Sequence, residues 1–290
     1  MQFPERPWPT GLAQQCEPLV RRVLAPNPSA FSYTGTQSYI VGAGNEVAVI
    51  DPGPADPAHV EALIAAIGDA RVTAIVCTHT HRDHSPAAAP LAQATGGAVI
   101  GCAFLAIDDD GPRSDAAFDQ TYRPERVLGD GENLSGPGWT LTALATPGHT
   151  SNHLCLALAE SGALFTGDHV MGWSTSVVSP PDGDMTAYMA SLQLLQERDD
   201  TVYYPAHGEA VTNPRQLVRG MIGHRRQREN QILRLLGEAS ASIPDMVPQM
   251  YKGVDQLLWP AAGRSVLAHL IDLERRGRVV RAGDQWSNAA

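Results

Sequence analysis

One short stretch constrains the fold of this chain more than any other. Residues 72–86, VTAIVCTHTHRDHSP, place His79, His81, Asp83 and His84 within six positions directly behind an apolar run. An extended chain points alternate side chains the same way, so His79, His81 and Asp83 converge just past the strand. Four titratable groups packed this closely without a counter-ion would bury unpaired polarity at a cost of several kcal/mol. The stretch therefore predicts a cation site at the end of a strand.

The residues behind the cluster predict a second site beside the first. Ser85 can cap a helix and Pro86 can open it, which would turn the chain sharply at this point. That turn lets Asp83 and His84 address a second point a few ångströms away. Two neighbouring cation sites are therefore geometrically available.

Three further apolar runs end in the same manner. LTALATPGHT delivers His149, ALFTGDH delivers Asp168, and VYYPAHGE delivers His207. If the three strands share a sheet, their ends cluster along one edge, where loops present side chains on a rigid base. Five imidazoles and two carboxylates without a thiolate favour divalent ions such as zinc, and manganese or iron also suits such donors.

The spacing of apolar residues predicts a sheet-based α/β core. Two strands within 38–53, a helix over 57–68 and a wholly apolar strand over 72–77 form a βαβ unit. A second helix and strand follow, and the acids, Gly and Pro of 108–122 predict an exposed loop. Short strands between 127 and 168, a helix over 185–198 and the strand 201–205 complete an α/β fold with helices outside the sheets.

A second unit is predicted from about Pro214 onwards. Apolar pairs spaced along 215–239 indicate one long helix, and 244–286 then read as helix, helix and hairpin, the outline of a compact winged helix. We therefore expect a catalytic domain over 1–214 and a C-terminal domain over 215–290.

Charge separates these two parts and bears on their partners. The net charge of −10 divides into 9 Arg against 24 acids over 1–214, and 12 Lys and Arg against 7 acids over 215–290. The part with the predicted metal donors should therefore repel polyanions, whereas the C-terminal part could attract them.

The sequence also predicts where the protein works. The first 15 residues lack the basic start and apolar stretch of an export signal, and no apolar run is long enough to span a bilayer. Four widely spaced cysteines suit reduced thiols better than a disulfide framework. We expect a cytoplasmic protein that makes no contact with a membrane; its oligomeric state stays open.

The motifs carry a family resemblance. THTHRDH, followed in order by PGHT, TGD and PAHG, with Asp51 at an earlier strand end, resembles the metallo-β-lactamase superfamily over about residues 35–210. The later segments GDHVMGWSTSVVSPPDGDMTAYMASL and GHRRQRENQI look most like its β-lactamase-like protein 2 group, which includes a single-strand-specific endoribonuclease. The related glyoxalase II hydrolases look similar over the core, but their basic glutathione-binding pattern is not seen. Because the chain shows no export signal, we rank β-lactam hydrolysis lower.

The resemblance implies an αβ/βα sandwich with a C-terminal winged-helix-like appendage and a two-metal site at one edge. Position by position, it implies one metal on His79, His81 and His149, a second on Asp83, His84 and His207, and Asp168 as a bridge. Two such ions, most simply Zn²⁺, lower the pKa of a shared water from about 15.7 toward 7 and stabilise a developing oxyanion. Asp83 could also steer a proton to the leaving group.

Three functions compete at this stage. The first is a binuclear hydrolase of a small ester, thioester or lactone, acting through a metal-bridging hydroxide. The second is a single-strand-specific endoribonuclease of the β-lactamase-like protein 2 kind, with RNA guided by the basic C-terminal part. The third is a DNA-binding metal sensor, which ranks low because Asp272 and Glu274 lie on its candidate recognition helix. The charge distribution favours the small substrate.

Several histidines and arginines are set apart from the predicted metal donors. His153 is either a residue that orients a ligand or a satisfied structural histidine, and His169 should face away from the metals. The strip Arg225, Arg226 and Arg228, beside His224, suits a solvated helix face better than an anion-binding strip over the active site. Two other histidines, His59 and His269, are expected at the surface, and Tyr203 and Tyr204 in the sheet core.

Overall fold

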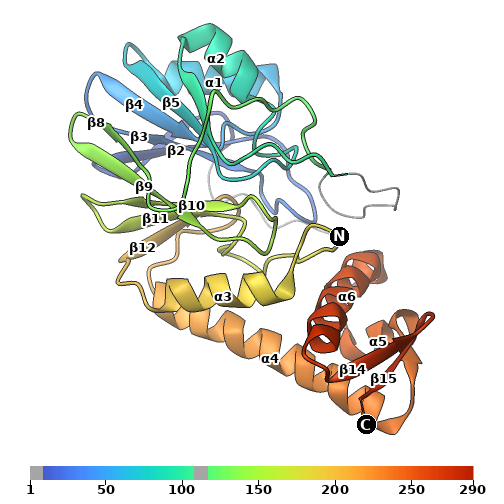
Figure 1. Cartoon of the computed structure of the whole chain (residues 1–290). Helices are drawn as coiled ribbons and strands as arrows, with labels where there is room; N and C mark the ends of the chain where they lie inside the picture. The colour runs from blue at the N-terminus through green and yellow to red at the C-terminus, as the bar shows by residue number, and fades with distance from the viewer. Residues whose placement is uncertain (1–8, 108–116, 290) are drawn as a thin grey trace.

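A computed structural model describes residues 9–107 and 117–289 of the chain. Two β-sheets pack face to face, helices cover their outer faces, and a smaller C-terminal unit lies at the end of a long helix (Figure 1). This αβ/βα sandwich with a winged-helix appendage is the predicted fold class. None of the helices in the described part of the chain is both long enough and apolar enough to cross a membrane.

The first sheet contains seven strands that lie in their order along the chain. Its first four strands are antiparallel and its last four parallel, so β4 belongs to both sets. They are β1 (Ala13–Glu17), β2 (Val20–Leu24), β3 (Gln37–Val41), β4 (Glu46–Ile50), β5 (Arg71–Cys77), β6 (Ala98–Gly101) and β7 (Arg126–Val127). Helices α1 (Pro57–Ile67) and α2 (Ala88–Thr95) connect the parallel strands β4, β5 and β6 and cover the outer face (Figure 1). The predicted βαβ unit is thereby confirmed.

The second sheet has five strands in the order β12-β11-β10-β9-β8. They are β8 (Asn133–Gly136), β9 (Trp139–Ala145), β10 (Leu154–Leu158), β11 (Ala163–Gly167) and β12 (Val202–Pro205). Neighbours are antiparallel except for β11 and β12, which are joined by α3 (Met185–Gln196). Side chains of α3 such as Tyr188 and Leu192 pack with Leu164 and Tyr203 beneath the sheet, as a parallel crossover helix must.

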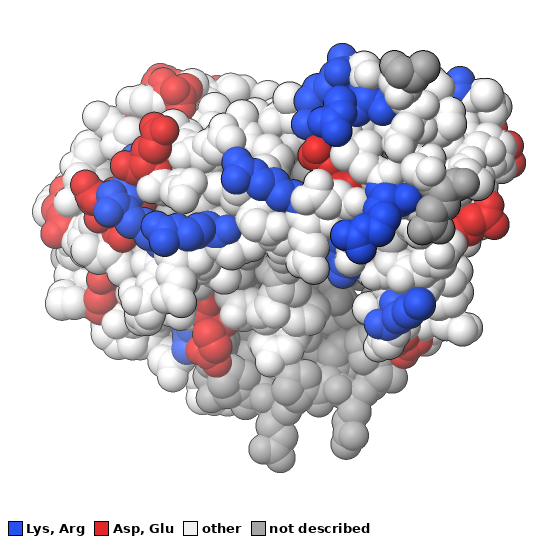
Figure 2. Space-filling view, turned by 90° about the horizontal axis from the view of Figure 1, so that it is seen from below, with Lys and Arg blue, Asp and Glu red and all other residues white. Residues whose placement is uncertain are grey.

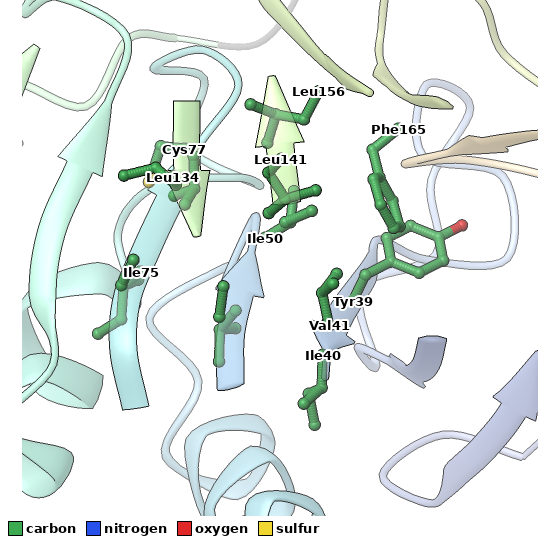
Figure 3. Packing of buried hydrophobic residues seen from close by; sticks show 14 of the residues in the cluster. Tyr39, Ile40, Val41, Ile50, Ile75, Cys77, Leu134, Leu141, Leu156 and Phe165 are labelled. Carbon is green, nitrogen blue, oxygen red and sulfur yellow. The ribbon is translucent and has the colours of Figure 1, made fainter. Parts of the chain in front are cut away.

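The main core lies between the two sheets. Figure 3 shows side chains of the first sheet, among them Tyr39, facing those of the second, among them Leu141 and Phe165. The rings of Tyr39 and Phe165 lie 5.1 Å apart in a tilted pair. Each such fully buried apolar side chain contributes about 1.5–3 kcal/mol, and together they hold the strand ends in register. The site is therefore built on strand ends that the main core holds together.

The C-terminal unit has a hydrophobic core of its own. It consists of α4 (Pro214–Glu238), β13 (Ala241–Ser242), α5 (Ile243–Met250), a 3₁₀ turn η1 (Gln256–Leu258), α6 (Trp259–Arg275), β14 (Val279–Ala282) and β15 (Gln285–Asn288). Trp286 is buried with Ile232, Val266 and Leu270, so the hairpin closes over α4 and α6. Ser242 and Asp245 form a capping box that starts α5. The helix, helix and hairpin predicted after the long helix are confirmed.

Some local predictions were wrong. The strands β1 and β2 were not predicted, because β1 is half exposed and β2 carries two arginines, which removes the apolar signal. The exposed loop predicted over 108–122 lies partly outside the described residues, and in its described part Phe118, Asp119 and Tyr122 are buried. The prediction about an export signal concerns mostly residues 1–8, which lie outside the described residues, and stays a prediction.

The histidines expected at the surface are instead buried. His59 is 1% exposed, because α1 turns this residue toward Ser38, whose Oγ lies 2.9 Å from its Nε2. His269 is 2% exposed on the inner face of α6. Tyr203 and Tyr204 lie in the core as expected.

Candidate metal centre and substrate pocket

Loops that follow four strands bring the seven predicted donors together. The chain leaves β5 through His79, His81, Asp83 and His84, and the ends of β9, β11 and β12 contribute the other three, His149, Asp168 and His207. The donor atoms form two compact groups, each within 4.8 Å: His79, His81, His149 and Asp168 in one, and Asp83, His84 and His207 in the other. The structure thus gathers all seven side chains at one edge of the sandwich.

Gly148 makes the approach of His149 possible. Its φ is 139°, a backbone conformation that other residues rarely adopt, and a Cβ at this position would overlap the backbone of Tyr188. The PGHT motif therefore has a glycine because the loop passes directly against the start of α3.

Hydrogen bonds on the outer side of the histidine rings turn one nitrogen of each toward the centre. Nδ1 of His149 donates to the carbonyl of Val177 at 2.6 Å, and Nδ1 of His207 donates to the carbonyl of Gly35 at 3.2 Å. His81 has the opposite orientation, with its Nδ1 3.0 Å from Nε2 of His79 and 3.1 Å from Nε2 of His149. Nitrogen atoms from three rings thus converge on one point, as ligands of a single ion do.

Asp51 orients one histidine of each group. Its Oδ2 lies 3.0 Å from Nδ1 of His84 and accepts the hydroxyl of Thr78 at 2.8 Å, and that hydroxyl lies 3.0 Å from Nδ1 of His79. Its Oδ1 accepts the backbone N–H of Thr78 at 2.7 Å. These bonds hold Asp51 at a φ of 45°, a rare conformation for a residue other than glycine. One buried carboxylate thus sets the rings of both groups.

Asp168 lies between the two groups and faces both. Its Oδ2 is 3.6 Å from Nε2 of His149, whereas its Oδ1 is 3.3 Å from Nε2 of His207 and 3.6 Å from Nε2 of His84. One of its oxygen atoms lies within 4.8 Å of the donor atoms of the first group. The distances show a different oxygen directed to each side.

The inward atoms fit a pair of cations. Oδ1 of Asp83, Oδ1 of Asp168 and Nε2 of His84 are buried and accept or donate no hydrogen bond within the described protein. Buried polar atoms without hydrogen bonds are costly, and three of them facing one space suit a shared cation. Imidazole nitrogen and carboxylate oxygen are the donors that zinc and similar divalent ions take.

The protonation states suit the same ions. Burial, reinforced by neighbouring imidazoles, lowers the pKa of His79 well below its usual range and that of His81 to about 3, so both rings are neutral at pH 7. Burial alone would lower the pKa of His84, but the carboxylates around it raise that pKa well above its usual value. The pKa of Asp168 is held low by His207 and His84 despite its burial. A divalent ion would take the place of protons on the second group.

A cavity of about 360 Å³ opens over these donors. Its floor includes His81, Asp83, His149, Asp168 and His207, and its walls come from segments far apart in the sequence. Phe31, Met171 and Trp173 line one part of it, and Tyr251, Val254 and Leu258 of the C-terminal unit line another. The two parts of the chain thus build one largely apolar pocket above the candidate metal centre.

Outside the seven donors, the structure sorts the remaining predictions. His153 accepts the backbone N–H of Asp168 at its Nε2, 3.2 Å away, and its Nδ1 lies 2.9 Å from the Thr146 hydroxyl, so it holds the backbone of Asp168 from outside the donor groups. The ring of His169 packs against Tyr188 and belongs to neither donor group.

The solvated face predicted for the arginine strip is wrong for Arg225. Arg225 is 3% exposed because α4 turns it toward α6 and the pocket. Arg228 is half buried in the same wall, and Arg226 is exposed as expected. Sequence reasoning also missed the pocket residues Phe31, Trp173 and Tyr251, which carry no local signal because no motif surrounds them.

Comparison with known proteins agrees with this geometry. The model of the metallo-beta-lactamase superfamily matches residues 33–207, and that of the beta-lactamase associated winged helix domain matches 242–286. A beta-lactamase-like protein 2 homolog of Drosophila melanogaster is 32% identical over 281 residues and covers 92% of each chain. An atrochrysone carboxyl ACP thioesterase of Aspergillus chevalieri is 34% identical over 228 residues, 78% of this chain and 68% of its own.

A solved structure shows the same fold. The crystal structure of a metallo-beta-lactamase family protein from Thermus thermophilus superposes with a TM-score of 0.77 at 22% identity, over 94% of this chain and all of its own. Proteins of this superfamily bind divalent metals, and the seven donors of this chain lie together at one edge of its sandwich. The chain belongs to the metallo-beta-lactamase superfamily and is a hydrolase of that superfamily with its associated winged-helix domain.

Proposed function

We propose that this chain is a binuclear metal-dependent hydrolase of a small thioester, ester or lactone. The observation that carries the proposal is the set of inward-facing donor atoms, three of them buried without a hydrogen bond within the described protein. His79, His81 and His149 would hold one ion, Asp83, His84 and His207 the other, and Asp168 would bridge them. Zinc is the first choice for these donors, and manganese or iron suits them as well.

The metal donors, Asp83 and the apolar pocket walls have different roles in the proposed reaction. The two ions, when bound, supply an activated water and positive charge for the developing oxyanion. The carboxylate of Asp83 takes, at its Oδ2, the proton that the attacking water loses and delivers it to the leaving group, because it is the more exposed of the two carboxylates and borders the pocket. The apolar walls at Phe31, Trp173 and Tyr251 hold the substrate and exclude water around the reacting carbonyl.

The shape and charge of the pocket support a small substrate. A cavity of about 360 Å³ is of the size that encloses a drug-sized molecule. One relative carries the name of an acyl carrier protein thioesterase, which places thioesters first among the substrates to be tried. The 24 acids over residues 1–214 oppose a long polyanion near the metals.

A second candidate function is single-strand-specific RNA cleavage. It is favoured by the relative named beta-lactamase-like protein 2 homolog and by the surplus of arginine over residues 215–290. Figure 2 shows, however, that Lys and Arg on the face seen from below form separate groups divided by uncharged surface. A groove that binds single-stranded RNA requires a continuous basic surface with aromatic side chains on which bases stack. RNA cleavage therefore ranks second. The DNA-binding metal sensor stays third, because Asp272 and Glu274 lie on α6.

The test is a substrate panel on the zinc- and manganese-loaded protein. It contains acyl thioesters, aryl esters, lactones and single-stranded RNA, each assayed for wild type and His81→Ala. The proposal expects turnover of at least one small acyl substrate that His81→Ala abolishes. RNA cleavage abolished by His81→Ala, without small-molecule turnover, would replace the first candidate by the second.

The cytoplasmic location also stays a prediction. All four cysteines, Cys16, Cys77, Cys102 and Cys155, are free thiols, which suits a reducing compartment. Fluorescence of a tagged full chain in its own cells is the direct measurement.

A further inference from the structure

One wall of the pocket above the candidate metal donors contains a buried positive charge without a negative partner among the described residues. Arg225 of α4 is 3% exposed and borders the same cavity as Asp83 and Asp168. None of the ion pairs among the described residues includes Arg225, although five other arginines form them. A buried guanidinium that cannot lose its proton needs compensation.

All of the described partners of Arg225 are neutral. Its Nη1 donates to the hydroxyl of Ser265 at 3.2 Å, its Nη2 donates to the carbonyl of Ser176, and its planar group lies 5.2 Å from the ring centre of Tyr188. Its Nε is buried and donates no hydrogen bond within the described protein. Neutral dipoles and one aromatic face hold the side chain in place but leave its full charge uncompensated.

The surroundings of Arg225 add positive charge and apolar surface. Arg228, one turn further along α4, lines the same wall and lies 4.4 Å from the ring centre of Tyr251, with its Nη1 bonded to the carbonyl of Met250 at 2.7 Å. Leu258 and Val254 border the pocket beside it. The wall therefore offers a cationic point within an apolar surface, which matches a molecule with an apolar body and one anionic group.

Hydrogen bonds through one short segment connect Arg225 to the metal donors. They fix the distance between the two places where the ends of such a molecule would bind. The hydroxyl of Ser176 donates to the carbonyl of Asp168, and the carbonyl of Ser176 accepts from Arg225. The next residue, Val177, accepts from His149. A single short segment thus holds the guanidinium and the donors in one rigid arrangement, so a molecule held at both ends would be positioned for reaction.

We propose that the substrate carries a carboxylate, which Arg225 receives, at the far end of an apolar body from the hydrolysed acyl bond. This inference rests on the proposed function, because it takes the pocket above the metals as the substrate site. Arg225 is a specificity-determining residue in this scheme, and Arg228 adds to the positive potential around the carboxylate.

The test is a binding measurement that does not require turnover. The probes are two non-hydrolysable thioethers with the same arylalkyl body, one ending in a carboxylate and the other in a carboxamide. Calorimetry on the metal-loaded full chain, with metal content verified, gives the ratio of their Kd values. A charge-assisted bond predicts that wild type binds the carboxylate about 10- to 100-fold more tightly.

Matched variants assign this preference to one side chain. Arg225→Gln should bring the ratio close to one, whereas Arg226→Gln, which removes the same charge from the exposed side of α4, should leave it unchanged. Arg225→Lys keeps the charge but loses the planar fork, so it should lower the ratio severalfold. If Arg225→Gln does not fold, the comparison of the Kd ratio between wild type and Arg225→Lys tests the inference.

Four results would overturn the inference: no carboxylate preference in wild type, a preference that survives Arg225→Gln, a preference that Arg226→Gln removes equally, or one unchanged in Arg225→Lys. Tight Arg225-dependent binding of a single-stranded oligonucleotide without carboxylate preference would overturn it as well. Hydrolysis of the corresponding thioesters is assayed separately. Preference without hydrolysis contradicts the proposed function alone, and hydrolysis without preference contradicts this inference alone.

Discussion

The metal-donor loops and the C-terminal wall of the pocket face one cavity but are built in opposite ways. The donors follow directly on strand ends of the sandwich, and outer hydrogen bonds such as that of Asp51 to His84 hold them. The wall consists of side chains from three places: helix α4, the segment between α5 and α6, and helix α6. These elements pack on a separate core around Trp286. The first region is built from short motifs at strand ends, and the second from side chains brought together by helix packing.

The largest difference between the regions should appear when one carboxylate is removed from each. Asp168→Ala takes away the oxygen atoms that face both donor groups, so kcat/KM should fall at least about a thousandfold, or ~4 kcal/mol. Asp284→Ala, on the exposed hairpin of the C-terminal unit, should change kcat/KM by less than about twofold. Steady-state kinetics measures both variants. Similar losses of kcat/KM in the two would contradict the different roles of the two regions.

Removing the centre of the C-terminal core should separate stability from metal binding. Trp286→Ala leaves a large cavity among Ile232, Val266 and Leu270 and should cost about 3–5 kcal/mol of the free energy of unfolding. Leu257→Ala, at a side chain 80% exposed, is the matched control and should cost less than about 0.5 kcal/mol. Urea unfolding followed by tryptophan fluorescence measures both, and metal content should stay at the wild-type level. A loss of bound metal in Trp286→Ala would show that the two regions are not independent.

A smaller loss of metal affinity is expected when the residue that orients the donor rings, Asp51, is changed. Asp51→Asn keeps the shape of the side chain but weakens the acceptor that orients His84 directly and His79 through Thr78. Metal affinity should fall about 10- to 100-fold, for both ions rather than one. Competition with a chelating dye measures it. Loss of only one ion would mean that Asp51 supports a single group.

The sequence predicts the metal-donor loops well and the C-terminal wall of the pocket poorly. Donors were predicted because THTHRDH, PGHT, TGD and PAHG lie directly after apolar strands, so each signal is contained in a few residues. The burial of Arg225, His59 and His269 was not predicted, since it depends on which element packs against each helix. The edge strands β1 and β2 were missed because arginines and half-exposed positions hide their alternation.

The smallest predicted effect concerns pH and His269. Burial, reinforced by Arg225, lowers the pKa of His269 to about 3, so the folded chain keeps this ring neutral where the unfolded chain, with a pKa near 6.5, binds a proton. The contribution of His269 to stability is therefore complete above pH 6.5 and is lost as pH falls toward 3. His269→Gln should show a shallower decline of the free energy of unfolding between pH 7 and pH 5. An identical decline in both proteins would show that His269 does not titrate in this way.

Two ions held by the seven donors are the basis of the proposed hydrolysis. Elemental analysis of the purified wild-type chain, with hydrolysis of a small acyl substrate measured before and after chelation, tests this directly. A binuclear centre should give two divalent ions per chain, loss of hydrolysis on chelation and recovery when two equivalents are returned. Full hydrolysis by a metal-free chain, or saturation by a single ion with full activity, would contradict it.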